Sequence, residues 1–338
     1  MKFGVFDHVD DSGLPLPEHL EARLQLAETY DRLGFHAYHV AEHHGTPLGH
    51  APNPSVFLAA LAQRTQRLRF GPLVYLLPLY HPLRLIEDVG TLDALSGGRL
   101  ELGYGRGISP IEMGFYGVDM DEQRERADET FDVLVKGLTS ERLSHDGQFF
   151  HFDDVPMVQR CVQKPHPPLW YGTNSPTSVE RCAKQRLNMV TLLAGEPMRA
   201  MIAGYRQAYA ASGGEPEAMP LLGVGRHVVV ADSDAEALAL ARPAFARWRE
   251  SFVHLWQARG ADNPFVKNFP ADWDALVATG AACAGSPETV RDFLAKEAEA
   301  ADFTYFVAQL IFGDMPLEAA QNSARLFASE VMPGFAGR

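Results

Sequence analysis

Cysteine is scarce in this chain, with three residues among 338. Cys161, Cys182 and Cys283 are widely spaced and odd in number, so they form neither a disulfide framework nor the paired spacing of a zinc site. Free cysteines at this low frequency are typical of a reducing compartment. We therefore expect the protein to reside in the cytoplasm.

Positive charge and long apolar runs are also lacking. The 30 basic residues are outnumbered by 43 acidic ones, and the formal net charge of -13 argues against nucleic acid or an anionic membrane as the main partner. No apolar run is long enough to span a bilayer. The amino terminus reads at once as a β-strand rather than as a signal peptide, so we expect a soluble intracellular protein.

Several common enzyme motifs are missing. Gly103-x-Gly105 resembles the start of a dinucleotide fingerprint, but Ile108 occupies the sixth position and no helix follows at once. The absence of a Gly-x-Ser-x-Gly elbow, and of any cysteine near a histidine in sequence, argues against a serine or cysteine nucleophile. The histidines at 39, 43 and 44 lack the helical His-Glu-x-x-His spacing and lie too far apart along a strand to chelate one metal ion easily.

Strand-like and helix-like segments alternate from end to end of the chain. We expect strands at 3–7, 35–40, 68–77, 99–104, 169–172, 188–193, 221–231 and 303–309, and helices at 17–33, 55–66, 82–95, 121–138, 176–185, 198–212, 234–258, from 286 and at 316–330. A hairpin with an Asp-Gly turn is expected at 143–152. Eight β-then-α units predict an α/β fold, a parallel (β/α)8 TIM-like barrel forming a single domain over residues 1–338.

The segment 259–285 interrupts this alternation. It contains glycine, proline and asparagine without a clear period, and it lies between the seventh helix and the eighth unit. Long unstructured insertions in barrels are often lids over the active site, although an exposed loop would have the same composition. We expect a lid-like insertion here.

Residues suited to chemistry stand at the ends of the expected strands, where α/β barrels keep their active sites. Glu42-His43-His44 follows the second strand, although a single histidine is as often a packed or surface residue. Arg106, flanked by glycines after the fourth strand, has the planar fork that binds phosphate. Gly172–Ser178, before the fifth helix, offers hydroxyls and free amides to an anion, and Ser175 is also a natural N-cap. Together the last two segments suggest a phosphorylated cofactor.

Taken together, these segments resemble the bacterial luciferase-like family of flavin-dependent monooxygenases over nearly the whole chain. The matching motifs, in chain order, are Met1–Gly4, Glu42-His43-His44, Leu77–Val89, Leu92-Asp93, Ser96–Arg99, Arg106-Gly107, Gln163–Trp170 and Glu330–Pro333. The resemblance implies a barrel that binds reduced FMN at its C-terminal rim. It also implies a monooxygenase that uses O2, through a flavin C4a-(hydro)peroxide, to oxidise a small organic substrate.

The resemblance further implies roles for individual residues. His43 corresponds to the family's catalytic histidine, which holds or protonates the peroxide. Arg106 corresponds to the phosphate-binding arginine, and Leu73-Val74 to a cis peptide bond under the flavin ring of the luciferase α subunit. The implied cofactor-binding set is Glu42, Leu73, Val74, Arg106, Ile108, Asn174, Ser175 and Ser178.

Two departures from the luciferase α subunit weaken light emission as the function. Gly105 stands where that subunit has a reactive cysteine beside the flavin, and the region 259–285 is shorter than its lid. Neither departure weakens flavin binding. Because Glu42-His43-His44 is retained, the resemblance favours an active subunit over an inert companion chain.

Apolar and aromatic residues at strand ends are candidates for the dry substrate pocket that a short-lived peroxide requires. They are Phe6, Tyr75, Leu77, Leu193 and Trp248, although barrel interiors are packed with such side chains. Arg226-His227 is a candidate anchor for an acidic or carbonyl group, and Arg226 is equally suited to pairing with a neighbouring acid. A long-chain aldehyde or another apolar carbonyl is the favoured substrate.

The missing dinucleotide fingerprint predicts that a separate NAD(P)H:flavin reductase supplies FMNH2. Three alternatives remain open: an F420-dependent oxidoreductase, against whose acidic tail the -13 charge argues mildly, a non-catalytic flavin-binding companion subunit, and, more remotely, a metal-dependent barrel hydrolase. Members of the family commonly dimerise through helices of the first units. Helix 55–66 is apolar enough for a homodimer interface, although a core helix would look similar.

Overall fold

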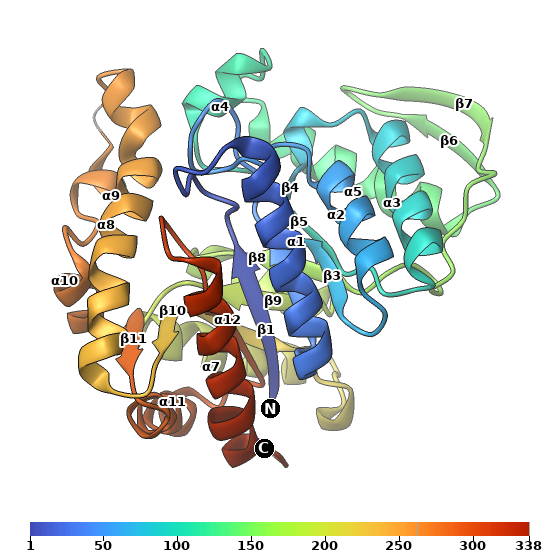
Figure 1. Cartoon of the computed structure of the whole chain (residues 1–338). Helices are drawn as coiled ribbons and strands as arrows, with labels where there is room; N and C mark the ends of the chain where they lie inside the picture. Colours follow the sequence, from blue (N-terminus) through green and yellow to red (C-terminus); the bar gives the residue numbers. More distant parts are fainter. Residues whose placement is uncertain (262, 338) are drawn as a thin grey trace.

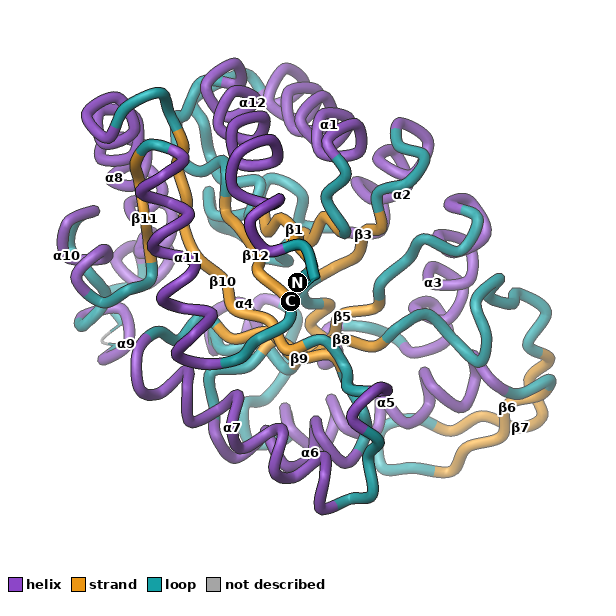
Figure 2. The backbone as a smooth tube through the Cα atoms, turned by 90° about the horizontal axis from the view of Figure 1, so that it is seen from below, coloured by secondary structure: helices purple, strands orange, loops and turns teal. Residues whose placement is uncertain are grey.

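The computed structural model describes residues 1–261 and 263–337. Parallel strands form a nearly closed barrel surrounded by helices (Figures 1 and 2). The strands of this sheet are β1 (Lys2–Asp7), β2 (Ala37–Val40), β3 (Arg69–Pro72), β4 (Tyr75–Leu76), β5 (Leu102–Gly105), β8 (Leu169–Gly172), β9 (Asn188–Thr191), β10 (Leu222–Val230), β11 (Ala282–Gly285) and β12 (Tyr305–Gln309). The TIM-like barrel predicted from the alternation is confirmed.

Main-chain pairing carries the sheet almost fully round. β1 pairs with β2 on one side and with β12 on the other, so the first and last strands are neighbours. β10 joins β9 to β12, and β4 pairs with β5. An isolated bridge between Phe70 and Leu100 pairs β3 with the approach to β5. Because the strands are parallel, their C-terminal ends meet at one rim, where the loops that follow them converge.

Helices cover the outside of the barrel (Figure 2). They are α1 (Leu16–Leu33), α2 (Pro54–Arg64), α3 (Pro82–Ser96), α5 (Gln123–Thr139), α6 (Val179–Lys184), α7 (Gly195–Ala211), α8 (Asp234–Ala258), α11 (Pro287–Ala301) and α12 (Leu317–Leu326). The expected hairpin is present as β6 (Arg142–Asp146) and β7 (His151–Pro156), paired antiparallel beside α5. No helix among the described residues is long and apolar enough to cross a membrane.

Two sets of apolar side chains fill the protein. The larger lies between the strands and the helices and includes Tyr30, Phe70 and Phe245. The smaller fills the barrel lumen, and its buried members are Phe6, Ala41, Leu73, Trp170, Val190, Tyr305 and Val307. A Cβ at Gly4 would lie 1.7 Å from the Tyr305 hydroxyl, so only glycine fits on that part of the wall. Since the lumen is packed, a binding site must lie above it at the rim.

The expectation of an unstructured insertion at 259–285 is wrong for most of its length; residue 262 lies outside the described residues. The segment contains α9 (Pro264–Lys267), α10 (Trp273–Ala278) and β11, which pairs with the C-terminal half of β10. β11 escaped prediction because its residues, Ala-Cys-Ala-Gly, include none of the β-branched or aromatic types that favour strands. Trp273 of α10 is buried and stacks on Phe312, with ring centroids 5.9 Å apart.

Two further elements differ from the prediction for the first half of the chain. The expected strand 68–77 is divided into β3 and β4 by Leu73-Val74, which is a cis peptide bond, as the resemblance implies. A short helix, α4 (Pro110–Phe115), follows β5 and was not anticipated. Ser109 is the N-cap of this helix, since its hydroxyl accepts a hydrogen bond from the backbone N–H of Glu112 at 3.2 Å.

Candidate active site

His43 lies at the C-terminal rim just after β2 and is held by Glu112 of α4. The Nδ1 atom of His43 is 3.2 Å from Glu112 Oε1, and the same oxygen accepts the backbone N–H of His44 at 2.7 Å. Burial favours the neutral acid, but the hydrogen bonds from His43 and His44 outweigh it and lower the pKa of Glu112. An ionised carboxylate only accepts, so the proton lies on Nδ1 of His43. The imidazole is therefore oriented with Nε2 left for chemistry, and its side chain is 25% exposed.

Glu42 is buried and makes its contacts within the protein. Its Oε1 is 2.8 Å from His44 Nε2, and its Oε2 accepts the Leu76 N–H and the Tyr80 O–H, both at 3.0 Å. Burial raises the pKa of Glu42, and these hydrogen bonds offset part of the rise. Glu42 thus ties the end of β2 to β4. The sequence placed it in the cofactor-binding set; its protein contacts give it a positioning role.

Leu73 and Val74 lie at the rim beside glycines of the neighbouring strands. A Cβ at Gly105 would lie 2.6 Å from Val74 Cγ2, and one at Gly172 would lie 3.3 Å from Val74 Cγ1. The absence of side chains at these positions lets β5 and β8 approach the cis peptide closely. Gly105 is also the residue that departs from the luciferase cysteine, and the approach to Val74 leaves no room for such a side chain unless Val74 moves.

Arg106 follows Gly105 at the end of β5. Its backbone carbonyl accepts the Gln123 amide at 2.9 Å, while its half-buried side chain forms no ion pair within the described part of the chain. Ile108, which the sequence placed in the cofactor-binding set, is 70% exposed. β5 pairs with β8, so the loop that carries Arg106 and the loop that follows Gly172 leave neighbouring strands.

The loop after β8 holds the three remaining residues of the predicted cofactor set. Asn174 Oδ1 accepts the Leu192 N–H at 2.9 Å and the Thr191 hydroxyl at 3.0 Å, so its side chain fastens this loop to the end of β9. Ser175 occupies the N-cap position of a 3-10 turn, Pro176–Ser178, but its hydroxyl pairs with that of Thr177 at 2.8 Å and caps no backbone N–H of the described chain. Ser178 is half-buried, and its hydroxyl forms no hydrogen bond among residues 1–261 and 263–337.

Three of the predicted substrate residues come together near His43. Phe6 closes the top of the lumen, Trp248 reaches the rim from α8, and His227 leaves β10 beside Trp248, with ring centroids 4.8 Å apart. All three are at least nine-tenths buried. They form a largely apolar wall that carries three ring nitrogens, one on Trp248 and two on His227.

The other predicted substrate residues point elsewhere. Tyr75 faces α2, where its hydroxyl is 2.8 Å from that of Ser55. Arg226 points to the face of β10 opposite to that of His227 and is fully buried. Its Nη2 atom lies 2.5 Å from Glu297 Oε2 of α11, so Arg226 pairs with an acid, as the second of the two expectations had it. Leu193 is half-buried, and its backbone carbonyl accepts a hydrogen bond from the Arg226 guanidinium. Leu77 belongs to the core between the barrel and the helices.

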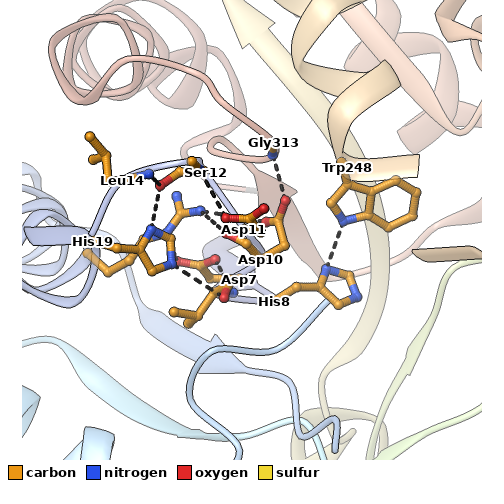
Figure 3. A network of polar contacts seen from close by, with 12 residues as sticks. Asp7, His8, Asp10, Asp11, Ser12, Leu14, His19, Trp248 and Gly313 are labelled. Atoms are coloured by element: carbon orange, nitrogen blue, oxygen red, sulfur yellow. Dashed lines mark hydrogen bonds and ion pairs between the residues drawn. The ribbon is translucent and has the colours of Figure 1, made fainter. Parts of the chain in front are cut away.

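His8 and Tyr116 join this cluster without having been singled out in the sequence. The His8 ring stacks on His43 with centroids 5.7 Å apart, and Trp248 Nε1 donates to His8 Nδ1 at 3.4 Å (Figure 3). Tyr116, just past α4, places its hydroxyl 2.8 Å from His44 Nδ1. The signal for His8 was its place directly after the first strand, where a polar residue faces the rim.

The loop that carries His8 is anchored by a buried ionic network (Figure 3). Asp7 accepts the N–H of Val9 at 2.7 Å, which supports the positive φ of 53° at that residue. Asp10 accepts the N–H of Gly313 at 2.7 Å and so joins the loop after β1 to the loop after β12. Arg23 of α1 lies between the two acids, 3.7 Å from Asp7 and 3.6 Å from Asp10.

Comparison with known proteins shows which protein family has this fold and these rim residues. The family profile of luciferase-like monooxygenases matches residues 1–304. The chain belongs to the luciferase-like monooxygenase family, which confirms the resemblance seen in the sequence. Within the described residues, no cluster of three or more histidines, cysteines or acids is suited to a metal ion.

Individual relatives extend over most or all of the chain. Protein y4wF of Sinorhizobium fredii (strain NBRC 101917 / NGR234), itself uncharacterised, is 40% identical over 332 residues, 98% of this chain and 96% of that protein. The oxygenase component of the flavin-dependent trigonelline monooxygenase of Acinetobacter baylyi is 29% identical over 246 residues, 70% of this chain and 67% of that protein. The crystal structure of monooxygenase RslO1 from Streptomyces bottropensis superposes with a TM-score of 0.89 at 29% identity, covering 99% of this chain and 100% of that one.

Proposed function

We propose that this protein is the oxygenase component of a two-component monooxygenase that uses FMNH2 and O2 to oxidise a small organic carbonyl compound. The observation that carries the proposal is His43, oriented by Glu112 at the C-terminal rim and 25% exposed there. A histidine held by an ionised carboxylate is suited to moving a proton at Nε2.

The residues beside His43 fit a flavin mononucleotide. The glycines of β5 and β8 let these strands pack closely against the Val74 side chain, which would present the Leu73-Val74 segment to a flat ring. The Arg106 guanidinium, without an ion pair in residues 1–261 and 263–337, has the geometry for a phosphate, and the Ser178 hydroxyl stands on the neighbouring loop. When bound, reduced flavin supplies the electrons that activate O2 for transfer of one oxygen atom to the substrate.

The protein's own contributions are orientation, proton control and exclusion of water. Glu112 orients His43, and Glu42 fastens the end of β2 to β4 so that His43 keeps its place relative to Leu73-Val74. Trp248 and Phe252 of α8 pack in parallel, with ring centroids 5.1 Å apart, and Phe269 of the 259–285 segment covers them. This aromatic cover favours a dry site.

A separate NAD(P)H:flavin reductase is the partner that this proposal requires. No dinucleotide fingerprint is present, since Ile108 stands at the sixth position of the Gly103-x-Gly105 segment. The A. baylyi relative is itself named as an oxygenase component. Purified protein with FMN alone should therefore oxidise NADH no faster than FMN in buffer does.

The direct test is anaerobic mixing of the protein with FMNH2, followed by air-saturated buffer, while the flavin spectrum is recorded. We expect the protein to delay the return of the oxidised FMN spectrum. His43→Ala should abolish most of this delay and lower oxygenation of a carbonyl substrate about 100-fold, whereas His151→Ala, on the exposed strand β7, should change neither. A return as fast as in buffer alone would contradict the proposal and direct the test to F420.

We also infer a homodimer formed through the outer face of α2. Phe57 and Leu61 pack inside the protomer, but Val56 is 68% exposed and Ala60 faces outward beside it. Light scattering during gel filtration should give the mass of a dimer, and Val56→Glu should convert it to a monomer. A monomeric wild-type protein at tens of micromolar would contradict this inference.

A further inference from the structure

A cavity of about 540 Å³ lies at the N-terminal end of the barrel, opposite the rim that carries His43. It is bounded by the start of β1 and by residues just before β2 and β3, and Figure 2, which looks onto this end, places the amino terminus at the centre of the view. Four cations line the cavity, Lys2, Arg67, Arg69 and Arg99, against one acid in the described part of its lining, Asp31. In a chain with a net charge of -13, this is a local excess of positive charge.

Two of the four cations are already held by the protein. Arg99 has acceptors for all five N–H groups of its guanidinium, and Arg69 is paired with Glu101. Asp31 is engaged as well, since its carboxylate accepts three backbone N–H groups at distances of 2.6 to 3.0 Å. Arg69, Arg99 and Asp31 therefore shape the wall of the cavity, and a ligand would be held by the other two cations.

Lys2 and Arg67 are the two cations that remain available. The Lys2 side chain is exposed and forms no hydrogen bond or ion pair with residues 1–261 and 263–337. The exposed Arg67 guanidinium donates once among these residues, from Nη2 to the backbone carbonyl of Asp31 at 3.1 Å, so its Nε and Nη1 atoms have no acceptor there. An arginine fork and an ammonium group in one cavity are suited to a phosphate, since both make charge-assisted hydrogen bonds to its oxygens.

His36 lines the same cavity and lies within the field of its cations. Burial, and after it the positive charges of Lys2 and Arg69, lowers the pKa of His36 to about 4. The ring is therefore neutral at pH 7. An anion that binds between Lys2 and Arg67 would change the electric field at this ring, which makes His36 a local reporter of binding.

We propose that this cavity is a binding site for a phosphate group, held between Lys2 and Arg67 at the end of the barrel opposite the site proposed for FMN. A phosphate dianion matches the two available cations, whereas a carboxylate carries half that charge. The volume of the cavity is that of ordinary small-molecule sites and exceeds the needs of a phosphate alone. Phe35 and Met332, which also line it, supply apolar surface for the organic part of a phosphate ester. The inference is independent of the proposed function.

The first test follows the ring protons of His36 by NMR at pH 7.5, with the signals assigned by their loss in His36→Gln. Inorganic phosphate and phenyl phosphate should each move these signals saturably, whereas sodium chloride at equal ionic strength and phenol should not. Tighter binding of phenyl phosphate would identify an ester as the ligand, and equal binding would identify free phosphate. The absence of a saturable shift up to about 20 mM of either phosphate would overturn the proposal.

The second test asks whether the two available cations hold the phosphate. Lys2→Gln and Arg67→Gln should each weaken binding about tenfold, and Arg67→Lys should recover part of the loss. Both residues are exposed, so the denaturation midpoint should not change. Arg84→Gln, which alters an exposed arginine of α3 whose side chain is 76% exposed, is the matched control and should bind as wild type does. Unchanged affinity in the Lys2 and Arg67 variants would overturn the proposal.

Binding at this cavity is distinguishable from phosphate binding at the C-terminal rim. Arg106→Ala should leave the response of His36 to both phosphates unchanged, because Arg106 lies at the other end of the barrel. Lys2→Gln should likewise leave FMN affinity and the delayed return of the oxidised FMN spectrum unchanged. A response of His36 that disappears in Arg106→Ala would overturn the proposal, since the phosphate would then bind at the rim.

Discussion

The two ends of the barrel use charged side chains in opposite ways. At the N-terminal end, Arg99 donates to Thr65, Leu68, Ala62 and Ser96, and all five N–H groups of its guanidinium have acceptors. At the C-terminal rim, the Arg106 side chain has no ion pair in the described part of the chain. The fully paired Arg99 therefore stabilises the fold, whereas the Arg106 guanidinium remains available for a ligand.

The same contrast holds for the neighbouring residues. Arg69, at the start of β3, is paired with Glu101 and donates to Gln163 at 2.7 Å, so it locks the closure of the sheet. At the rim, by contrast, the buried His227 Nε2 has no hydrogen-bond partner within residues 1–261 and 263–337. In barrels of this kind conserved chemistry belongs to the C-terminal face and stability to the other. Single substitutions at the two ends should therefore separate stability from flavin binding.

The largest effect on stability is expected for Arg99→Ala. The variant leaves several backbone carbonyls of α2 and its following turn without donors, which should lower the free energy of unfolding by about 3 kcal/mol. FMN affinity of the folded fraction should stay within twofold of wild type. Urea denaturation followed by tryptophan fluorescence checks the first point and FMN fluorescence quenching the second. An unchanged denaturation midpoint would show that complete pairing does not identify stabilising residues here.

The reverse outcome is expected for Arg106→Ala. Loss of a charge-assisted contact to phosphate should weaken FMN binding about 30-fold, close to 2 kcal/mol, with the denaturation midpoint unchanged. Arg106→Lys should recover only part of the affinity, because the charge remains but the fork is lost. Riboflavin, which lacks the phosphate, should bind wild type and Arg106→Ala equally. A variant that weakens FMN and riboflavin alike would place Arg106 away from the phosphate.

The alternation of strands and helices predicted the barrel, and the motif directly after β2 placed His43 at its rim, because both depend on local signals. The sequence did not predict Glu112, which is 69 residues from His43 and lies on a short helix without periodicity. Nor did it predict the contacts of Asn174 with Thr191 and Leu192, since an amide at a loop start looks the same whether it faces a ligand or the neighbouring strand. Such partnerships depend on which loops adjoin at the rim, and that follows from the closed barrel rather than from any segment.

Asp10 tests whether incomplete pairing at the rim also has a cost in stability. Its Oδ1 has no hydrogen bond among the described residues, and burial raises its pKa from 3.8 to about 7. For a carboxyl whose pKa is raised by folding, stability is full below the unfolded value and falls as the pH rises towards the folded value. Wild type should therefore lose about 2 kcal/mol relative to Asp10→Asn between pH 4 and pH 7. Stability curves that run parallel over this range would contradict the prediction.

The smallest effect separates two residues on one loop. Asn174→Ala removes the acceptor for the Leu192 N–H and the Thr191 hydroxyl, so it should lower the free energy of unfolding by about 1 kcal/mol and leave FMN affinity nearly unchanged. Ser178→Ala removes a hydroxyl with no protein partner in the described residues, so it should weaken FMN binding several-fold without changing stability. Both variants are measured by the same denaturation and quenching experiments. If Asn174→Ala instead weakened FMN binding and left the free energy of unfolding unchanged, the Asn174 amide would have to leave β9 to bind the cofactor. The hydrogen bonds of the flavin-free protein would then not distinguish stabilising residues from binding residues on this loop.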